Sequence, residues 1–155
     1  MGIQTLHSAN IVHRDIKIEN ILMSDFSVDA KAFIADLGSA CKLSSPTESI
    51  NFKIGTPGYI APEILSGENY SFPCDIWSIG CLLHVLLTAT PPFWDDDRKE
   101  RNRKVCYDAL NFDDNQYAMS LSDPCKDFLL CLLHKDPRQR PSITQVFSHP
   151  WLWAN

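Results

Sequence analysis

The sequence predicts one mainly α-helical unit with a small β element near its N-terminal end. Two short apolar runs, 21–23 and 32–35, are joined by a polar turn at 24–29 and are typical of a pair of strands. From residue 58 onward the apolar spacing is helical. The 155 residues are 45% hydrophobic and 21% charged, which excludes a disordered or fibrous protein. Because there is no repeat and no linker, we expect one compact unit.

The N-terminal third reads as short elements separated by loops. Residues 1–10 resemble the end of a helix, and the apolar pair Ile11-Val12 is followed by a charged loop. The stretch 39–54 is rich in Ser, Thr and Lys and lacks periodicity, so we predict a loop there. Gly-Thr-Pro-Gly at 55–58 is typical of a turn.

A buried helix is predicted from Pro73 to about Thr88. Proline is tolerated in the first helical turn, and the pair at 91–92 ends the helix. A helix that is apolar on every side belongs in a core or in a membrane. The stretch 76–94 has no Asp, Glu, Lys or Arg, but its strongly apolar part ends at Leu87 and is too short to span a bilayer. We therefore expect a core helix and no membrane span.

Three more helices are predicted toward the C-terminus. Residues 97–110 are polar and rich in charge. Ser122 can cap a second helix that has Pro124 in its first turn, and Ser142 with Gln145 forms a capping box for a third. The second helix should turn four apolar residues inward: Phe128, Leu129, Leu132 and Leu133.

Charge and cysteine content limit the partners and the compartment. The formal charge is −5 and there is no Lys/Arg run, which argues against nucleic-acid binding and would suit a basic peptide. Six cysteines form no C-x-x-C pair, so a zinc ribbon is not expected. No secretory signal opens the sequence. We expect reduced thiols in an intracellular protein, cytoplasmic or nuclear.

An ordered set of motifs runs through the chain. Each specified position reduces chance matches about twentyfold, so such a set is highly specific. The motifs are His-Arg-Asp-Ile-Lys-Ile-Glu-Asn at 13–20, Asp-Leu-Gly at 36–38, Gly-Thr-Pro-Gly-Tyr-Ile-Ala-Pro-Glu at 55–63, Asp-Ile-Trp-Ser-Ile-Gly at 75–80, Asp-Pro and Arg-Pro within 136–141, and His-Pro-Trp at 149–151.

With these motifs the chain resembles the large, C-terminal lobe of a eukaryotic Ser/Thr protein kinase over essentially all 155 residues. Pro-Phe-Trp at 92–94 and the closing His-Pro-Trp resemble the calcium/calmodulin-dependent group most. The resemblance implies a partial kinase domain at 1–155, with a catalytic loop at 13–20 and an activation segment at 36–63. The implied function is transfer of the γ-phosphate of ATP to Ser or Thr of a protein, with Mg²⁺.

The resemblance also assigns catalytic roles. Asp15 would accept a hydrogen bond from the attacking hydroxyl, and Lys17 would contact the transferred phosphate. Lysine at that position is a mark of Ser/Thr kinases. Thr56 should hydrogen-bond near both side chains. Glu19 either faces a basic residue of a peptide substrate or is simply solvated, and the sequence favours neither alternative.

The resemblance to the kinase family also implies nucleotide-binding and metal-binding residues. Besides Lys17, the nucleotide-binding positions are Asn20, Leu22 and Asp36. Asn20 and Asp36 match the magnesium ligands, and magnesium prefers oxygen. Leu22, with Ala35, would line the adenine pocket, although plain core residues would look the same in sequence.

Two further contacts are implied for the scaffold. Asp75, at the start of the buried helix, should hold the backbone of residues 13–14, because a buried carboxylate needs donors. Glu63 should pair with Arg140.

The chain departs from the family pattern at two substituted positions and one missing region. Leu37 replaces the usual Phe, and Phe52 stands at the usual activation-loop phosphosite, three residues before Gly55. Thr47 and Ser49 remain as acceptors that the family pattern does not select. The family's glycine-rich loop, strand lysine and helix glutamate precede the catalytic loop, and only twelve residues precede His13 here.

Two hypotheses follow from the missing small lobe. The first is a truncated Ser/Thr kinase domain with little activity alone, and the second is a non-catalytic, kinase-derived interaction module. In both, the interlobe face should be apolar and exposed, and would suit a covering partner.

Overall fold

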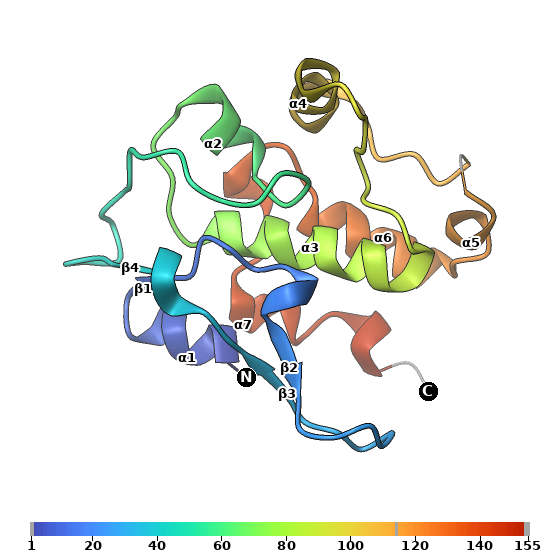
Figure 1. Cartoon of the computed structure of the whole chain (residues 1–155), viewed down its shortest axis with the longest axis horizontal. Helices are drawn as coiled ribbons and strands as arrows, with labels where there is room; N and C mark the ends of the chain where they lie inside the picture. The colour runs from blue at the N-terminus through green and yellow to red at the C-terminus, as the bar shows by residue number, and fades with distance from the viewer. Residues whose placement is uncertain (1, 114, 154–155) are drawn as a thin grey trace.

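The structure, a computed structural model, describes residues 2–113 and 115–153. Helix α3 (Pro73–Thr88) runs through the middle of the molecule (Figure 1). Helices α2 (Pro62–Ser66) and α4 (Arg98–Tyr107) lie on one side of it, and α1 (Gly2–Ser8) with the strands lies on the other (Figure 1). The molecule is thus mainly helical with small sheets, as the sequence predicts.

Two antiparallel strand pairs form the β part. Strand β2 (Ile21–Met23) pairs with β3 (Ala32–Ile34), as predicted, with Leu22 opposite Phe33. Strand β1 (Ile11–Val12) pairs with β4 (Cys41–Lys42). The prediction of a loop throughout 39–54 is therefore wrong at β4. That strand is only two residues long, and its partner residues lie 29 and 31 positions earlier in the chain, so no local periodicity indicates it.

Helix α3 has the features expected of a core helix. Pro73 stands in its first turn, and the helix ends at Ala89 in a left-handed conformation, two residues before Pro91. Gly80 permits the close approach of α3 to residues 132–133, because a Cβ there would lie 2.8 Å from a methyl of Leu133. No helix in the described part of the chain is both long and apolar enough to cross a membrane.

The C-terminal helices largely follow their sequence signals. Helix α4 is shorter than the predicted 97–110, because Asp97 is the N-cap, accepting from the backbone N–H of Glu100, and the helix ends at Tyr107. Helix α6 (Asp123–Leu132) buries three of the four residues expected to face inward, and the fourth, Leu133, is buried directly after its end. The predicted capping box is present at the start of α7 (Ile143–Val146). The remaining elements are α5 (Gln116–Met119) and the 3-10 turns η1 (Ile18–Asn20), η2 (Leu37–Ser39), η3 (Pro137–Gln139) and η4 (Pro150–Trp153).

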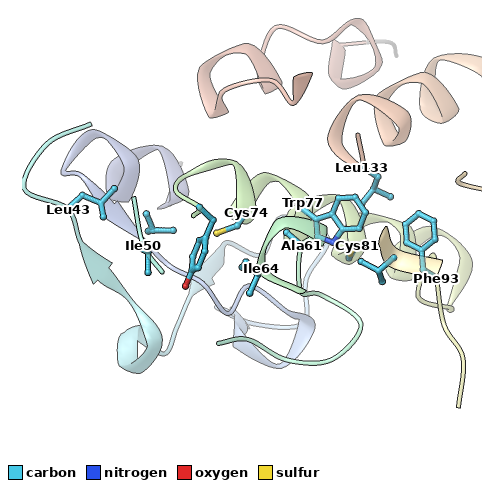
Figure 2. Close-up of a cluster of buried hydrophobic side chains, with 12 residues drawn as sticks. Leu43, Ile50, Ala61, Ile64, Cys74, Trp77, Cys81, Phe93 and Leu133 are labelled. Carbon is cyan, nitrogen blue, oxygen red and sulfur yellow. The ribbon is translucent and has the colours of Figure 1, made fainter. Parts of the chain in front are cut away.

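The main hydrophobic cluster is built around Trp77. Figure 2 shows the indole of Trp77 among Ala61, Cys81, Phe93 and Leu133. Its ring stacks on Phe93 with 5.7 Å between the ring centroids. Because the cluster extends to Leu43 and Ile50, it attaches the segment after β4 to the core helix. A second cluster joins α1, α3, α6 and α7.

Glu63 and Arg140 form the predicted ion pair in this interior. Two parallel hydrogen bonds of 2.7 and 2.8 Å join the guanidinium to the carboxylate, across 77 positions of sequence. Both side chains are almost completely buried. Arg140 also donates to the carbonyls of Pro73 and His134, so the pair fastens α2 to the start of α3 and to the segment around η3.

We predict that Glu63→Ala destabilises the protein by about 3–5 kcal/mol, because Arg140 would be left buried and uncompensated. Urea unfolding followed by circular dichroism measures this. The control is Arg138→Ala, which breaks an exposed pair with Asp136 and should cost less than about 1 kcal/mol. Near-wild-type stability of Glu63→Ala would contradict the structural role of the pair.

The six cysteines should carry free thiols and differ in reactivity. Desolvation raises the pKa of the buried thiols Cys74 and Cys81 and also of Cys125 and Cys131, which leaves less thiolate to react. We therefore expect Cys41 and Cys106, which are half-buried, to be alkylated first in the folded protein. Time-resolved mass spectrometry under non-reducing conditions measures the order. A stoichiometric native disulfide, or early labelling of Cys74, would show the prediction to be wrong.

Candidate active site

The catalytic-loop segment is fixed to the core helix by Asp75. Its two carboxylate oxygens each accept a backbone N–H, from His13 and from Arg14, at 2.9 Å. This is the contact that the sequence predicts. The side chain of His7 adds a third contact, with 2.9 Å between Nε2 and the Asp75 carboxylate. No motif indicated His7, because it lies in α1, outside the matched segments.

Asp15, Lys17 and Thr56 meet at one point. The Thr56 hydroxyl donates to Oδ1 of Asp15 at 2.6 Å and accepts from the Lys17 ammonium at 2.8 Å. The same ammonium lies 3.0 Å from Oδ2 of Asp15. Thr56 is 41 positions from Asp15, so the turn at 55–58 has to return to the catalytic loop to make this contact. The predicted position of Thr56 beside both residues is confirmed.

These contacts shift the pKa of both charged groups. Partial burial alone would raise the pKa of Asp15, but the hydrogen bond from Thr56 and the adjacent Lys17 outweigh burial and hold it below the ordinary 3.8. The hydrogen bond to Asp15 raises the pKa of Lys17. Asp15 is thus an ionised carboxylate at neutral pH that can accept a hydrogen bond from a hydroxyl.

Asn20 is oriented by the Asp15 backbone. Its amide nitrogen donates to the carbonyl of Asp15 at 2.8 Å, and this leaves the Oδ1 oxygen for another partner. Among the described residues no hydrogen bond to that oxygen is found. The side chain is buried, which gives an amide oxygen in a fixed position.

The pairing of β2 with β3 brings Asp36 close to Asn20. Ala35 donates its N–H to the Asn20 carbonyl at 2.8 Å, which extends the β2–β3 pairing by one position. Asp36 follows directly, in a left-handed conformation (φ 60°), and its Oδ1 accepts from the N–H of Gly38 at 3.0 Å. Asn20 and Asp36 therefore supply oxygens at neighbouring positions, the donor type that Mg²⁺ prefers.

Leu22 and its neighbours form an exposed apolar surface. Leu22 and Phe33 lie opposite each other on β2 and β3, and more than half of each side chain is exposed. The other large exposed hydrophobic residues of this region are Ile18, Met23, Phe26, Val28 and Leu37. The apolar, exposed face expected beside the catalytic loop is present.

A second chain of hydrogen bonds, which no motif indicated, holds the segment 39–52. Arg14 donates from Nε to the carbonyl of Ser39 at 2.6 Å, and one of its terminal nitrogens lies 3.4 Å from the Tyr70 hydroxyl. That hydroxyl donates to the carbonyl of Phe52 at 2.7 Å. Phe52 cannot be phosphorylated, so these contacts hold the segment without a phosphate at that position. Pairing of Ile50 with Tyr70 supports the same placement.

Comparison with known families matches residues 1–152 to the protein kinase domain. The chain is 39% identical over 151 residues to the serine/threonine-protein kinase PLK4 of Drosophila grimshawi, covering 97% of this chain and 19% of that protein. It is 35% identical over 151 residues to the calcium/calmodulin-dependent protein kinase cmkA of Emericella nidulans, covering 97% of this chain and 36% of that protein. For calcium-dependent protein kinase 12 of Arabidopsis thaliana the identity is 35% over 150 residues, with 97% and 30% covered.

We predict that Thr56→Val raises the pKa of Asp15, because it removes the shortest hydrogen bond to the carboxylate. Thr56→Ser keeps the hydroxyl and should leave the pKa near the wild-type value. Carboxylate NMR titration measures both. Because the folded-state pKa is depressed, Asp15 contributes stability above pH 3.8 that is lost as the pH falls through its folded-state pKa. An unchanged pKa in Thr56→Val would contradict this role for the hydroxyl.

Proposed function

The chain belongs to the protein kinase domain family, and on that premise we propose that it carries the substrate- and metal-binding half of a Ser/Thr protein kinase. The reaction is transfer of the γ-phosphate of ATP to a serine or threonine hydroxyl of a protein. The observation that supports this most is the contact of Lys17 and Thr56 with the Asp15 carboxylate. The Asp15 carboxylate is an ionised hydrogen-bond acceptor that these contacts hold in place, with the Lys17 ammonium beside it.

Each residue of this group has a separate task in the proposed reaction. Asp15 accepts a hydrogen bond from the substrate hydroxyl and orients its oxygen toward the γ-phosphorus. The new oxygen–phosphorus bond forms as the bond to the leaving ADP oxygen breaks, and the hydroxyl proton passes to the Asp15 carboxylate. Lys17 balances the negative charge of the phosphoryl group during transfer.

Asn20 and Asp36 are the residues that would hold magnesium. Their free oxygens fit a hard cation, and the Asn20 amide nitrogen is already occupied by Asp15. Bound Mg²⁺ would neutralise phosphate charge. Leu22 lies on the exposed apolar face and would contact the adenine ring.

The rest of the nucleotide site would come from a segment that covers this face. The chain spans about a fifth of the length of the PLK4 relatives, 19% of the Drosophila grimshawi protein. The family's glycine-rich loop and strand lysine have no counterpart among the 155 residues. We propose that a small lobe or a partner protein packs on the exposed apolar surface around Leu22 and Phe33.

A non-catalytic interaction module is the second candidate, and the same exposed apolar face favours it. In that case the surface would hold a partner permanently and no phosphate would be transferred. The complete set of Asp15, Lys17, Asn20 and Asp36 favours the enzyme. For either function we propose a protein or peptide ligand with a basic residue that faces the exposed Glu19. We also propose a reducing compartment, the cytoplasm or nucleus.

We predict that the 155 residues by themselves transfer phosphate negligibly and bind Mg-ATP weakly. They supply the lower half of the site, whereas this reaction depends on positioning the phosphates from both sides. A small lobe of a related kinase joined ahead of residue 1 should give turnover, and Asp15→Ala should then abolish it. Radiolabelled phosphate transfer to a Ser-containing peptide measures both forms.

Three outcomes distinguish the alternatives for this prediction. Turnover of the fused protein that depends on Asp15 supports the enzyme. A fused protein that binds Mg-ATP and peptide but does not turn over favours the interaction module. Strong Asp15-dependent activity of the 155 residues alone would show that the missing positioning matters less than proposed here.

A further inference from the structure

A cavity of about 370 Å³ lies between the activation segment, α2 and α4. One wall is formed by 53–58, the segment that also places Thr56 on Asp15. Figure 1 shows α2 and α4 on the same side of the core helix, with this segment passing beside them. The floor is apolar, with Ile60, Ile64 and Val105.

The rim of this cavity is positively charged. Arg98, Arg101, Asn102 and Val105 line it from α4, and their spacing places them on one face of that helix. Lys53 lines it from the activation segment. Three cations therefore surround one small cavity in a chain whose formal charge is −5.

None of the three cations has a carboxylate partner among the described ion pairs. Lys53 donates to the backbone carbonyl of Leu65 at 2.7 Å. Arg101 donates to the backbone carbonyl of Asp95 at 2.9 Å and lies over the Trp94 ring, 4.7 Å from its centroid. These contacts hold Lys53 and Arg101 in place without a direct carboxylate partner. Asp95 nevertheless lies near enough that the hydrogen bond from Lys104 and, to a lesser degree, the charge of Arg101 lower its pKa. Both side chains, Lys53 and Arg101, keep further N–H donors.

Two of the other three cations of α4 have carboxylate partners. Arg103 is paired with Glu100 and with Asp108, and Lys104 is paired with Asp95. Lys99, which lies outside the lining of the cavity, also has no carboxylate partner, so Arg98 and Arg101 are distinguished by their convergence with Lys53 on one cavity. The convergence of Lys53, Arg98 and Arg101 on one cavity indicates a ligand with negative charge.

The distance of the cavity from Asp15 indicates that its ligand is part of the substrate protein. Gly55 and Pro57 line it, and the residue between them donates to Asp15 at 2.6 Å. An extended peptide advances about 3.3 Å per residue, so a substrate whose hydroxyl is at Asp15 reaches the cavity within a few residues.

We infer that this cavity binds an Asp or Glu side chain of the substrate protein, located within a few residues of the phosphorylated hydroxyl. The inference rests on the proposed function and deepens it, because it names a specificity site. It also differs from the general expectation of a basic substrate: a basic residue would suit Glu19, whereas this second position selects a carboxylate.

The test is peptide binding to the 155-residue chain at low salt, measured by fluorescence anisotropy. Otherwise identical Ser-containing peptides carry Glu, Gln or Lys at the positions flanking the serine. The Glu peptide at the matching position should bind roughly fivefold more tightly than the Gln peptide, as expected for a few exposed ion pairs. Added salt should reduce the difference.

Charge reversal with a matched control locates the effect. Arg98→Glu should abolish or invert the Glu preference. Lys99→Glu changes the same charge on the same helix, outside the residues that line the cavity, and should leave the preference intact. Equal affinity for all peptides, absence of peptide binding, or an equal effect of both substitutions overturns the inference.

Peptide binding tests the cavity assignment independently of phosphate transfer, which tests the proposed function. A Glu preference that depends on Arg98 supports the cavity assignment even if the fused protein described above transfers no phosphate. Phosphate transfer by that protein without any preference for Glu would support the kinase and overturn the cavity assignment.

Discussion

The buried carboxylate of Asp75 is the constraint on which the active-site geometry depends. It is fully excluded from solvent, so an unpaired charge there would be very costly. The N–H groups of His13 and Arg14 donate to it, and the His7 imidazole lies within hydrogen-bond distance of it. The requirement is reciprocal, because without the carboxylate two backbone donors would be left unsatisfied. Since Asp75 lies on α3, the catalytic loop takes its position directly from the core helix.

The rest of the site is assembled on this fixed loop from two directions. The β2–β3 register brings Asp36 beside Asn20, through the bond between Ala35 and the Asn20 carbonyl. The activation segment returns Thr56 to Asp15, and it is held by the Trp77 cluster and by Tyr70. Each route depends on pairing or packing between distant positions. The site residues are therefore close because the fold is formed, and no local segment could place them.

The sequence predicted what local pattern or motif can encode. Pro73, the all-apolar helix and the box at Ser142 are local signals, and the structure follows them. The Glu63–Arg140 contact spans 77 positions and was predictable only through the motif set. Strand β4, His7 and Tyr70 were not predicted. Their partners lie in other parts of the chain, and tertiary contact decides a two-residue strand or a single side-chain hydrogen bond.

The contacts around Asp15 also bear on which part of the proposed reaction the chain can prepare alone. Thr56 and Lys17 hold the carboxylate with bonds made entirely within the chain, so its orientation does not require a nucleotide. Preorganised groups of this kind need no rearrangement when charge develops. In the proposed function the oxygens of Asn20 and Asp36 would bind Mg²⁺, and a covering segment would pack on the exposed face around Leu22. A segment packing on that face would therefore contribute phosphate positioning and exclusion of water, while acceptor orientation is already built into the large lobe.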